Sequence, residues 1–333
     1  VLDASGQLVT DFTGIVNPTV KDSKVTVTCL KNSNKDDTPA FTFTDYPNTI
    51  FIGNDSVRNG KFSFTFTVPK DISYSNLQGK MNLYAVDTES GNEAQGNFDN
   101  FIVGGTSDTA ETDTIGPEIR ALYLNDTTFV DGGQVNTTPY FVAELWDKSG
   151  VNITGSSVGH DMMLVIDEST VLSYNLNSYY ELLPGEEGAG IVKFPIPALE
   201  PGKHTAEFWV WDIQNNSTVR TFTFEVVEGL KPFLFDVIAT PGIAREQVTF
   251  HLMHNRPESR MRVGIMVYDL AGRQLWKHEE SGTSGLFENY TVSWDLTCGG
   301  ARMRPGVYIY RAAISTDNSK DATKARKFII LGE

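Results

Sequence analysis

The sequence has little cysteine, no cluster of basic residues and no long hydrophobic run. Cys29 and Cys298 are the two cysteines among 333 residues. They fall in segments that we expect to be different domains, and because bridged Cα atoms must lie within about 7 Å, no disulfide is expected between them. Asp and Glu number 42 against 27 Lys and Arg, for a net charge of −15. This balance argues against binding to nucleic acid or to an anionic membrane surface.

Targeting and membrane-spanning segments are also lacking. The chain begins at Val1 without a charged and then apolar leader, and it has no apolar run of about 18 residues that would predict a membrane-spanning helix. We therefore expect no membrane insertion, and we expect the sequence to be a fragment of a longer exported protein.

Recognisable catalytic motifs are missing as well. The sequence contains no G-x-S-x-G, H-E-x-x-H or P-loop pattern, and nucleophilic catalysis needs a Ser, Cys or Thr beside a base. His160 next to Asp161 is the most suggestive of the five histidines, but a structural turn is the favoured interpretation there. No catalytic residue, no zinc site and no cofactor is predicted. An enzymatic role for His160 and Asp161 remains as an alternative.

Two Trp-Asp pairs stand at the ends of expected strands in the middle of the chain. They are Trp146-Asp147 and Trp211-Asp212, each followed by a polar turn. The simpler interpretation is an Asx-turn, in which the carboxylate accepts hydrogen bonds from its own backbone. If the two loops met at one end of a sandwich, these side chains could instead ligate Ca²⁺.

Period-two alternation dominates the sequence, and helical periodicity is almost absent. In Lys61–Val68, for example, Phe62, Phe64 and Phe66 share one face, which predicts a half-buried strand. Turn signals such as Asn59-Gly60 and Pro201-Gly202 separate such runs. Repeated short strands with turn punctuation predict an all-β protein made of β-sandwiches. The other strands expected before residue 230 are Lys24–Leu30, Lys80–Val86, Tyr140–Trp146, Met162–Ile166, Ile191–Ile196, Glu207–Asp212 and Thr221–Val227.

Two composition changes divide the chain into three expected immunoglobulin-like sandwiches. Gly104–Pro117 is polar, acidic and without apolar periodicity, which is typical of a linker. A second change falls near Val227–Pro232. The predicted domains are residues 1–104, 105–229 and 230–333, each of a size usual for such a sandwich.

The last segment contains seven expected strands in about a hundred residues. Asp269, Gly272 and Arg273 belong to a predicted hairpin turn, in which Gly272 supplies a positive φ. Pro305-Gly306 is expected to start a strand in which Tyr308 and Tyr310 share one face, while Val307, Ile309 and Arg311 take the other. The final run Lys327–Leu331 is compatible with an exposed edge or with a core strand.

The order "YDLAGRQLW", "WDL" with "GG", and "PGVYIYR" resembles the C-terminal domains of proteins exported by the type IX secretion system. The phrases "DTIGPEIRALYLND", "DKSGVN", "GHDM" and "HNRPES" resemble more specifically the type IX secretion sortases, a group of gingipain-like C25 cysteine peptidases. The resemblance runs from Thr19 onward, and nothing in the chain matches the catalytic Cys and His segments of that family. The last domain is thereby expected to be a type IX secretion C-terminal domain.

The resemblance implies a non-catalytic stalk and secretion or docking region of a cell-surface sortase that removes C-terminal signals from cargo. It implies a Gram-negative outer membrane, export through the periplasm, and outer-membrane components of the secretion system as partners, including a β-barrel shuttle protein. The residues it singles out for docking or secretion are Asp269, Gly272, Arg273, Gly306, Val307, Tyr308, Tyr310 and Arg311. The alternative is the C-terminal part of a secreted cargo protein, such as an adhesin or a carbohydrate-binding surface protein.

Overall fold

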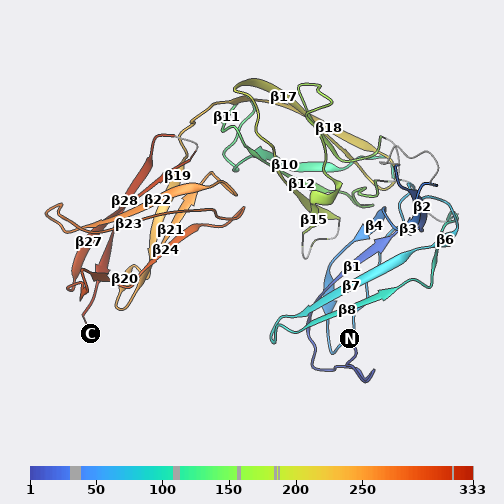
Figure 1. Ribbon diagram of the computed structural model, residues 1–333, viewed down its shortest axis with the longest axis horizontal. Coiled ribbons are helices and arrows are strands. Elements are labelled where there is room, and N and C mark those ends of the chain that lie inside the picture. The colour runs from blue at the N-terminus through green and yellow to red at the C-terminus, as the bar shows by residue number, and fades with distance from the viewer. Residues whose placement is uncertain are drawn as a thin grey trace. The chain divides into compact units, whose positions relative to one another are not determined.

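The protein is all-β, as predicted. The computed structural model describes residues 1–30, 39–107, 113–155, 159–183, 186, 188–316 and 319–332. Strand content is 52% and helix content 1%. Within these ranges, the helical residues form the short 3₁₀ turn η1 (Asn177–Tyr179), and Figure 1 shows strands from β1 near the N-terminus to β28 near the C-terminus. Among the described residues, no helix is long enough and apolar enough to cross a membrane.

The first segment is built around an antiparallel sheet with the strand order β4-β1-β7-β8, in which β5 also pairs with β1. Val16, Val20 and Ala85 point from this sheet into buried clusters. Two short ladders, β2-β3 and β6-β9, lie outside it. The strands are β1 (Gly14–Lys21), β2 (Val25–Thr28), β3 (Thr42–Asp45), β4 (Thr49–Ile52), β5 (Asp55–Val57), β6 (Leu77–Gln78), β7 (Lys80–Asp87), β8 (Glu93–Phe98) and β9 (Ile102–Val103).

The predicted strand Lys61–Val68 is not a strand in the structure. The segment from Phe62 to Val68 is not in a strand, although its side chains still alternate between half-buried and exposed positions as far as residue 67. Phe64 and Phe66 stack on Phe51, with ring centroids 5.8 and 4.7 Å away. The apolar face is therefore buried by aromatic packing, while the backbone joins no ladder among the described residues.

The middle segment has the sheet order of an immunoglobulin-like sandwich. One sheet runs β10-β12-β16-β15 and the other β11-β18-β17-β13-β14. The first order matches the A-B-E-D sheet of that fold, and the run β18-β17-β13 in the second matches its G-F-C sheet. Strand β17 lies between β18 and β13, and its Phe208 and Val210 are fully buried. Its bounds and those of its neighbours are β10 (Glu118–Leu124), β11 (Gln134–Val135), β12 (Tyr140–Trp146), β13 (Met163–Ile166), β14 (Ser173–Asn175), β15 (Tyr180–Leu182), β16 (Ala189–Pro195), β17 (Gly202–Trp211) and β18 (Ser217–Val226).

The last segment repeats this topology with a shorter first sheet, β19-β21-β24, and a second sheet β20-β28-β27-β22-β23. In both segments a two-residue strand pairs in parallel with the last strand, β11 with β18 and β20 with β28. Figure 1 shows the two C-terminal sheets in orange and red. Their strands are β19 (Leu234–Thr240), β20 (Ile243–Ala244), β21 (Val248–His254), β22 (Met261–Tyr268), β23 (Gln274–Gly282), β24 (Tyr290–Trp294), β25 (Thr297–Cys298), β26 (Ala301–Arg302), β27 (Gly306–Ser315) and β28 (Ala322–Ile330).

Aromatic side chains fill the core between these two sheets. The Phe250 ring lies 4.9 Å from that of Tyr310 and 6.0 Å from that of Phe328, and all three are at most 1% exposed. Trp276 stacks on Trp294 at 4.5 Å. Because aromatic residues bury large areas in preferred pair geometries, this cluster contributes strongly to the stability of the segment.

The final run Lys327–Leu331, for which the sequence allowed either an exposed edge or a core strand, belongs to a core strand as far as Ile330. In β28, Phe328 and Ile330 are 1% exposed, and the strand is paired on one side with β27 and on the other with β20. The run therefore completes the sandwich instead of presenting a bare hydrophobic edge.

Both cysteines are free thiols, as expected. The chain groups into two compact units, one of Val1–Leu122, Ala143–Lys193 and Thr205–Phe222, the other of Tyr123–Val142, Phe194–His204 and Thr223–Glu333. The division falls inside strands of the middle segment. The partition into residues 1–104, 105–229 and 230–333 thus stays a prediction, and residues 108–112 of its first linker lie outside the described residues.

Replacing Phe250 by Ala is expected to lower the free energy of unfolding of the C-terminal segment by about 3–5 kcal/mol, since a large buried ring is removed. The control Phe233→Ala alters a ring that is 57% exposed, and we expect it to cost less than about 1 kcal/mol. Urea unfolding of the two variants measures both values. Equal losses would contradict the assignment of the core.

Candidate functional site

Three of the predicted docking residues form the turn between β22 and β23. Asp269 Oδ1 accepts hydrogen bonds from the backbone NH groups of Ala271, at 3.1 Å, and Arg273, at 2.9 Å. These bonds hold the pKa of the Asp269 carboxyl below its usual value, and the bond from the Arg273 backbone has the largest effect. Gly272 has φ +82°, a conformation that side chains rarely adopt. Asp269 and Gly272 therefore shape the turn, while the Arg273 side chain is 77% exposed.

The remaining predicted residues start strand β27 at Gly306, and the pleat divides them between two faces. Tyr308 and Tyr310 point inward, and their hydroxyls donate to the carbonyls of Arg304, at 2.7 Å, and Val237, at 3.0 Å. Burial raises the pKa of Tyr310. Val307 and Arg311 point outward and are exposed. The two tyrosines thus hold the sandwich together, and the outward residues are available to a partner.

Strand register extends the outward residues into a patch that we call the C-terminal outer face. Val307 pairs with Ile329, which pairs with Ile243, and Ile309 pairs with Tyr268 and Lys327. Ile243 is 55% exposed, Val307 39% and Ile309 37%. Alternation in the sequence predicts the outward side of β27, and strand register adds residues of three other strands to it. The C-terminal outer face consists of Ile243, Tyr268, Val307, Ile309, Arg311, Lys327 and Ile329.

His160, the alternative catalytic residue, has a different carboxylate partner from the one beside it in sequence. Its Nδ1 lies 2.7 Å from Asp71 Oδ2, and its ring lies 4.4 Å from that of Trp211. Asp161 instead accepts a bond from Asn177. The carboxylate partner of His160 is therefore distant in sequence, and the neighbouring Asp161 bonds elsewhere.

Asp71 is the centre of this polar cluster. It is 7% exposed and also accepts hydrogen bonds from Asn152 Nδ2, at 3.1 Å, and Asn215 Nδ2, at 2.9 Å. A buried carboxylate needs such donors to offset the loss of hydration. The cluster thus joins the loop that follows Pro69 to turns that are distant in sequence.

The Trp-Asp turns meet, as the calcium hypothesis required. One carboxylate oxygen each of Asp113, Asp147 and Asp212 lies within 4.8 Å of the others. Burial raises the pKa of Asp147, and the Asp212 charge adds to the rise. Asp147 Oδ1 also accepts bonds from the NH groups of Ser149, at 2.8 Å, and Gly150, at 2.9 Å. The Asx-turn interpretation is therefore confirmed, and the same side chains form a group of hard oxygen ligands of the type that calcium uses.

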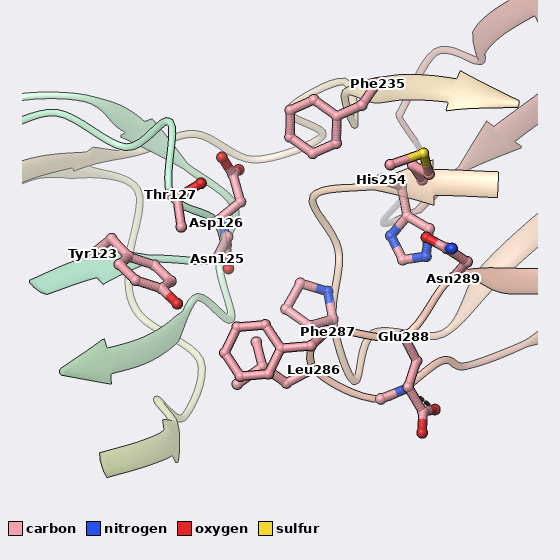
Figure 2. Close-up of a pocket in the computed structure, with 13 residues that line it drawn as sticks. Tyr123, Asn125, Asp126, Thr127, Phe235, His254, Leu286, Phe287, Glu288 and Asn289 are labelled. Carbon is pink, nitrogen blue, oxygen red and sulfur yellow. Dashed lines mark hydrogen bonds between the residues drawn. The ribbon is translucent and has the colours of Figure 1, made fainter. Parts of the chain in front are cut away.

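A pocket of about 210 Å³ lies beside His254 (Figure 2). His254 Nδ1 accepts the backbone NH of Arg256 at 3.0 Å, so the neutral ring carries its proton on Nε2 and donates it to Ser284 Oγ, 2.9 Å away. Burial, with the Arg256 charge, lowers the pKa of His254 to about 4. The ring is a hydrogen-bond donor to Ser284 and not its base. Other lining residues are Tyr123, Asn125, Asp126, Thr127, Phe235, Leu286, Phe287, Glu288 and Asn289.

Stability is expected to decrease as the pH is lowered, because of His254. Its pKa is about 6.5 when unfolded and about 4 when folded, so its neutral form stabilises the fold fully above pH 6.5. That contribution, about 2–3 kcal/mol, is lost as pH falls from 6.5 to 4. Urea unfolding across this range should show a shallower pH dependence for His254→Gln than for wild type. His251→Gln is the control, and an unchanged slope in His254→Gln would refute the assignment.

Replacing Asp71 by Asn is expected to cost about 1.5–3 kcal/mol in unfolding free energy. One of its two acceptor oxygens becomes a donor that faces other donors, and bonds to a charged group are lost. Asp161→Asn is the matched control, since we expect less than about 1 kcal/mol there. A larger loss for Asp161→Asn than for Asp71→Asn, measured by urea unfolding, would contradict the placement of Asp71 at the centre of the cluster.

Comparison with known proteins finds a similarity that extends over the whole chain. Dimeric latent PorU from Porphyromonas gingivalis is 37% identical over 100% of this chain and 31% of its own, with a TM-score of 0.40. The Ig1-2 module of the Drosophila receptor tyrosine phosphatase DLAR is 10% identical over 65% of this chain and 98% of its own, with a TM-score of 0.25.

Native alpha-2-macroglobulin from Escherichia coli is 10% identical over 64% of this chain and 71% of its own, with a TM-score of 0.31. No family model and no curated protein matches the chain. The relationship to PorU rests on its sequence identity over the whole chain. The chain spans 31% of that PorU chain, and it is related in sequence to this segment of PorU.

Proposed function

We propose that this chain is the non-catalytic C-terminal stalk and docking region of a cell-surface type IX secretion sortase. The observation that carries the proposal is the 37% identity to PorU over the entire chain. Domains that share only a secretion signal would match over the last segment alone, whereas this similarity includes the first and middle segments. In this proposal the cysteine peptidase activity belongs to a part of the sortase that the chain does not align with.

We propose further that the C-terminal outer face docks on an outer-membrane component of the secretion system, a β-barrel shuttle protein. Its exposed Ile243, Val307 and Ile309 offer an apolar centre, and the exposed Arg311 and Lys327 stand beside it. Apolar centres with polar rims are the usual anatomy of protein interfaces. The protein would be displayed at the cell surface after export through the periplasm.

Deletion of the chain after Lys231 is expected to leave the protein in the periplasm, because the docking segment is removed. The point variant Ile309→Asp should retain the fold, since Ile309 points outward, and should reduce surface display as well. Thr323→Asp, on the same sheet but away from the patch, is the matched control and should be displayed normally. Protease accessibility on intact cells measures display. Normal display of the truncated protein would refute the proposal.

Mass spectrometry of the surface protein separates this proposal from the cargo alternative. A sortase that retains its own C-terminal segment should keep Glu333, whereas a cargo protein should lose the segment on secretion. A mature chain that ends before residue 230 would favour an adhesin or carbohydrate-binding cargo protein.

A further inference from the structure

A second surface, far from the C-terminal segment in sequence, is formed by three adjacent strands of the first segment. Strands β1, β7 and β8 are consecutive in their sheet (Figure 1). The register places Asn17, Tyr84 and Gln95 in one row across them, and Thr19, Asn82 and Asn97 in the next. These six side chains line a hollow of about 400 Å³. We call this surface the amide face.

The amide face contains no charged residue. Its flanking rows do, with Glu93 opposite Val86 at one end and Lys21 opposite Lys80 at the other. The chain as a whole has a net charge of −15, so this surface differs from the average in its charge. It lacks the cations that nucleic acid requires and the carboxylates that a metal ion would use.

The polar groups of the amide face are available to a ligand. Among the described residues, the side chains of Asn17, Asn82, Gln95 and Asn97 make no hydrogen bond within the protein, and the structure places all four at exposed positions. Each amide offers one acceptor oxygen and two donor hydrogens. Four of them in two parallel rows present both donors and acceptors over three strands, a width of about 10 Å.

Tyr84 supplies the single large ring in the hollow. It is 39% exposed, and a hydrogen bond to Glu93 raises the pKa of its hydroxyl and holds the ring in place. A protein interface of ordinary size would need several apolar anchors. One flat ring surrounded by amides instead fits a molecule with an apolar face and many hydroxyl groups.

We propose that the amide face binds a neutral oligosaccharide. The C–H face of one sugar ring packs on Tyr84, and its hydroxyls exchange hydrogen bonds with Gln95 and Asn82. The ends of the glycan chain lie over the rows of Asn17 and Asn97. Strand β8 is the edge of the sheet. A long glycan can therefore extend past the sheet on that side. This inference is independent of the proposed sortase function.

The test uses the full chain with an array of immobilised neutral glycans, followed by calorimetry with soluble maltohexaose, cellohexaose, mannohexaose and chitohexaose. Binding to at least one glycan is expected. Tyr84→Ala and Gln95→Glu should each weaken it about tenfold or more, because stacking or amide donors are lost. Gln78→Ala, an exposed glutamine on β6, should leave binding unchanged.

Side-chain amide resonances distinguish this site from binding elsewhere. Addition of the glycan should shift those of Asn82 and Gln95 in NMR spectra, and circular dichroism should show both variants folded. Gln95→Glu preserves side-chain volume, so it tests the site even if Tyr84→Ala unfolds. Absence of binding to every glycan, or binding that both folded variants retain, would overturn the proposal. Self-association through this face, abolished by Gln95→Glu, would overturn it as well.

Discussion

The pleat of the β-strand divides the residues of each strand between a buried face and an open face, and both candidate surfaces depend on this constraint. In β27, Tyr310 enters the aromatic core while Ile309 and Arg311 face outward. In β7, Met81 and Ala85 pack inward while Asn82 and Tyr84 face outward. A shift of one residue would exchange the two sets, so the packing of the core also fixes the chemistry of each exposed face.

The same constraint explains which strands the sequence predicts well. Alternation is local, and it located β12 at Tyr140–Trp146 and β7 from Lys80 within a residue of their ends. It failed for Lys61–Val68 because alternation records which side chains are buried and says nothing of backbone pairing. Phe64 and Phe66 bury one face of that segment on Phe51 without a neighbouring strand.

Polar sites were predictable where their bonds are local and not where they are distant. The Asp269–Arg273 turn and the Asx-turns of Asp147 and Asp212 follow from neighbouring residues. His160 pairs with a carboxylate 89 residues away, and Asn215 reaches the same carboxylate across 144 residues. Asp161 stood beside His160 in the enzymatic alternative only because it is adjacent in sequence. No sequence pattern in a single chain specifies such pairs, since the fold brings them together.

Net charge constrains partners only where the charge is evenly distributed over the surface. A net charge of −15 suggests that an acidic partner would be repelled, yet the C-terminal outer face carries the exposed cations Arg311 and Lys327 beside apolar side chains. Because exposed charges are screened over about 8–10 Å at physiological salt, a docked partner is affected mainly by the charges at its own interface. The amide face likewise presents uncharged side chains at its centre, with Glu93 at one end and Lys21 and Lys80 at the other. Each surface therefore selects its partner by local composition, which strand register determines and overall charge does not reveal.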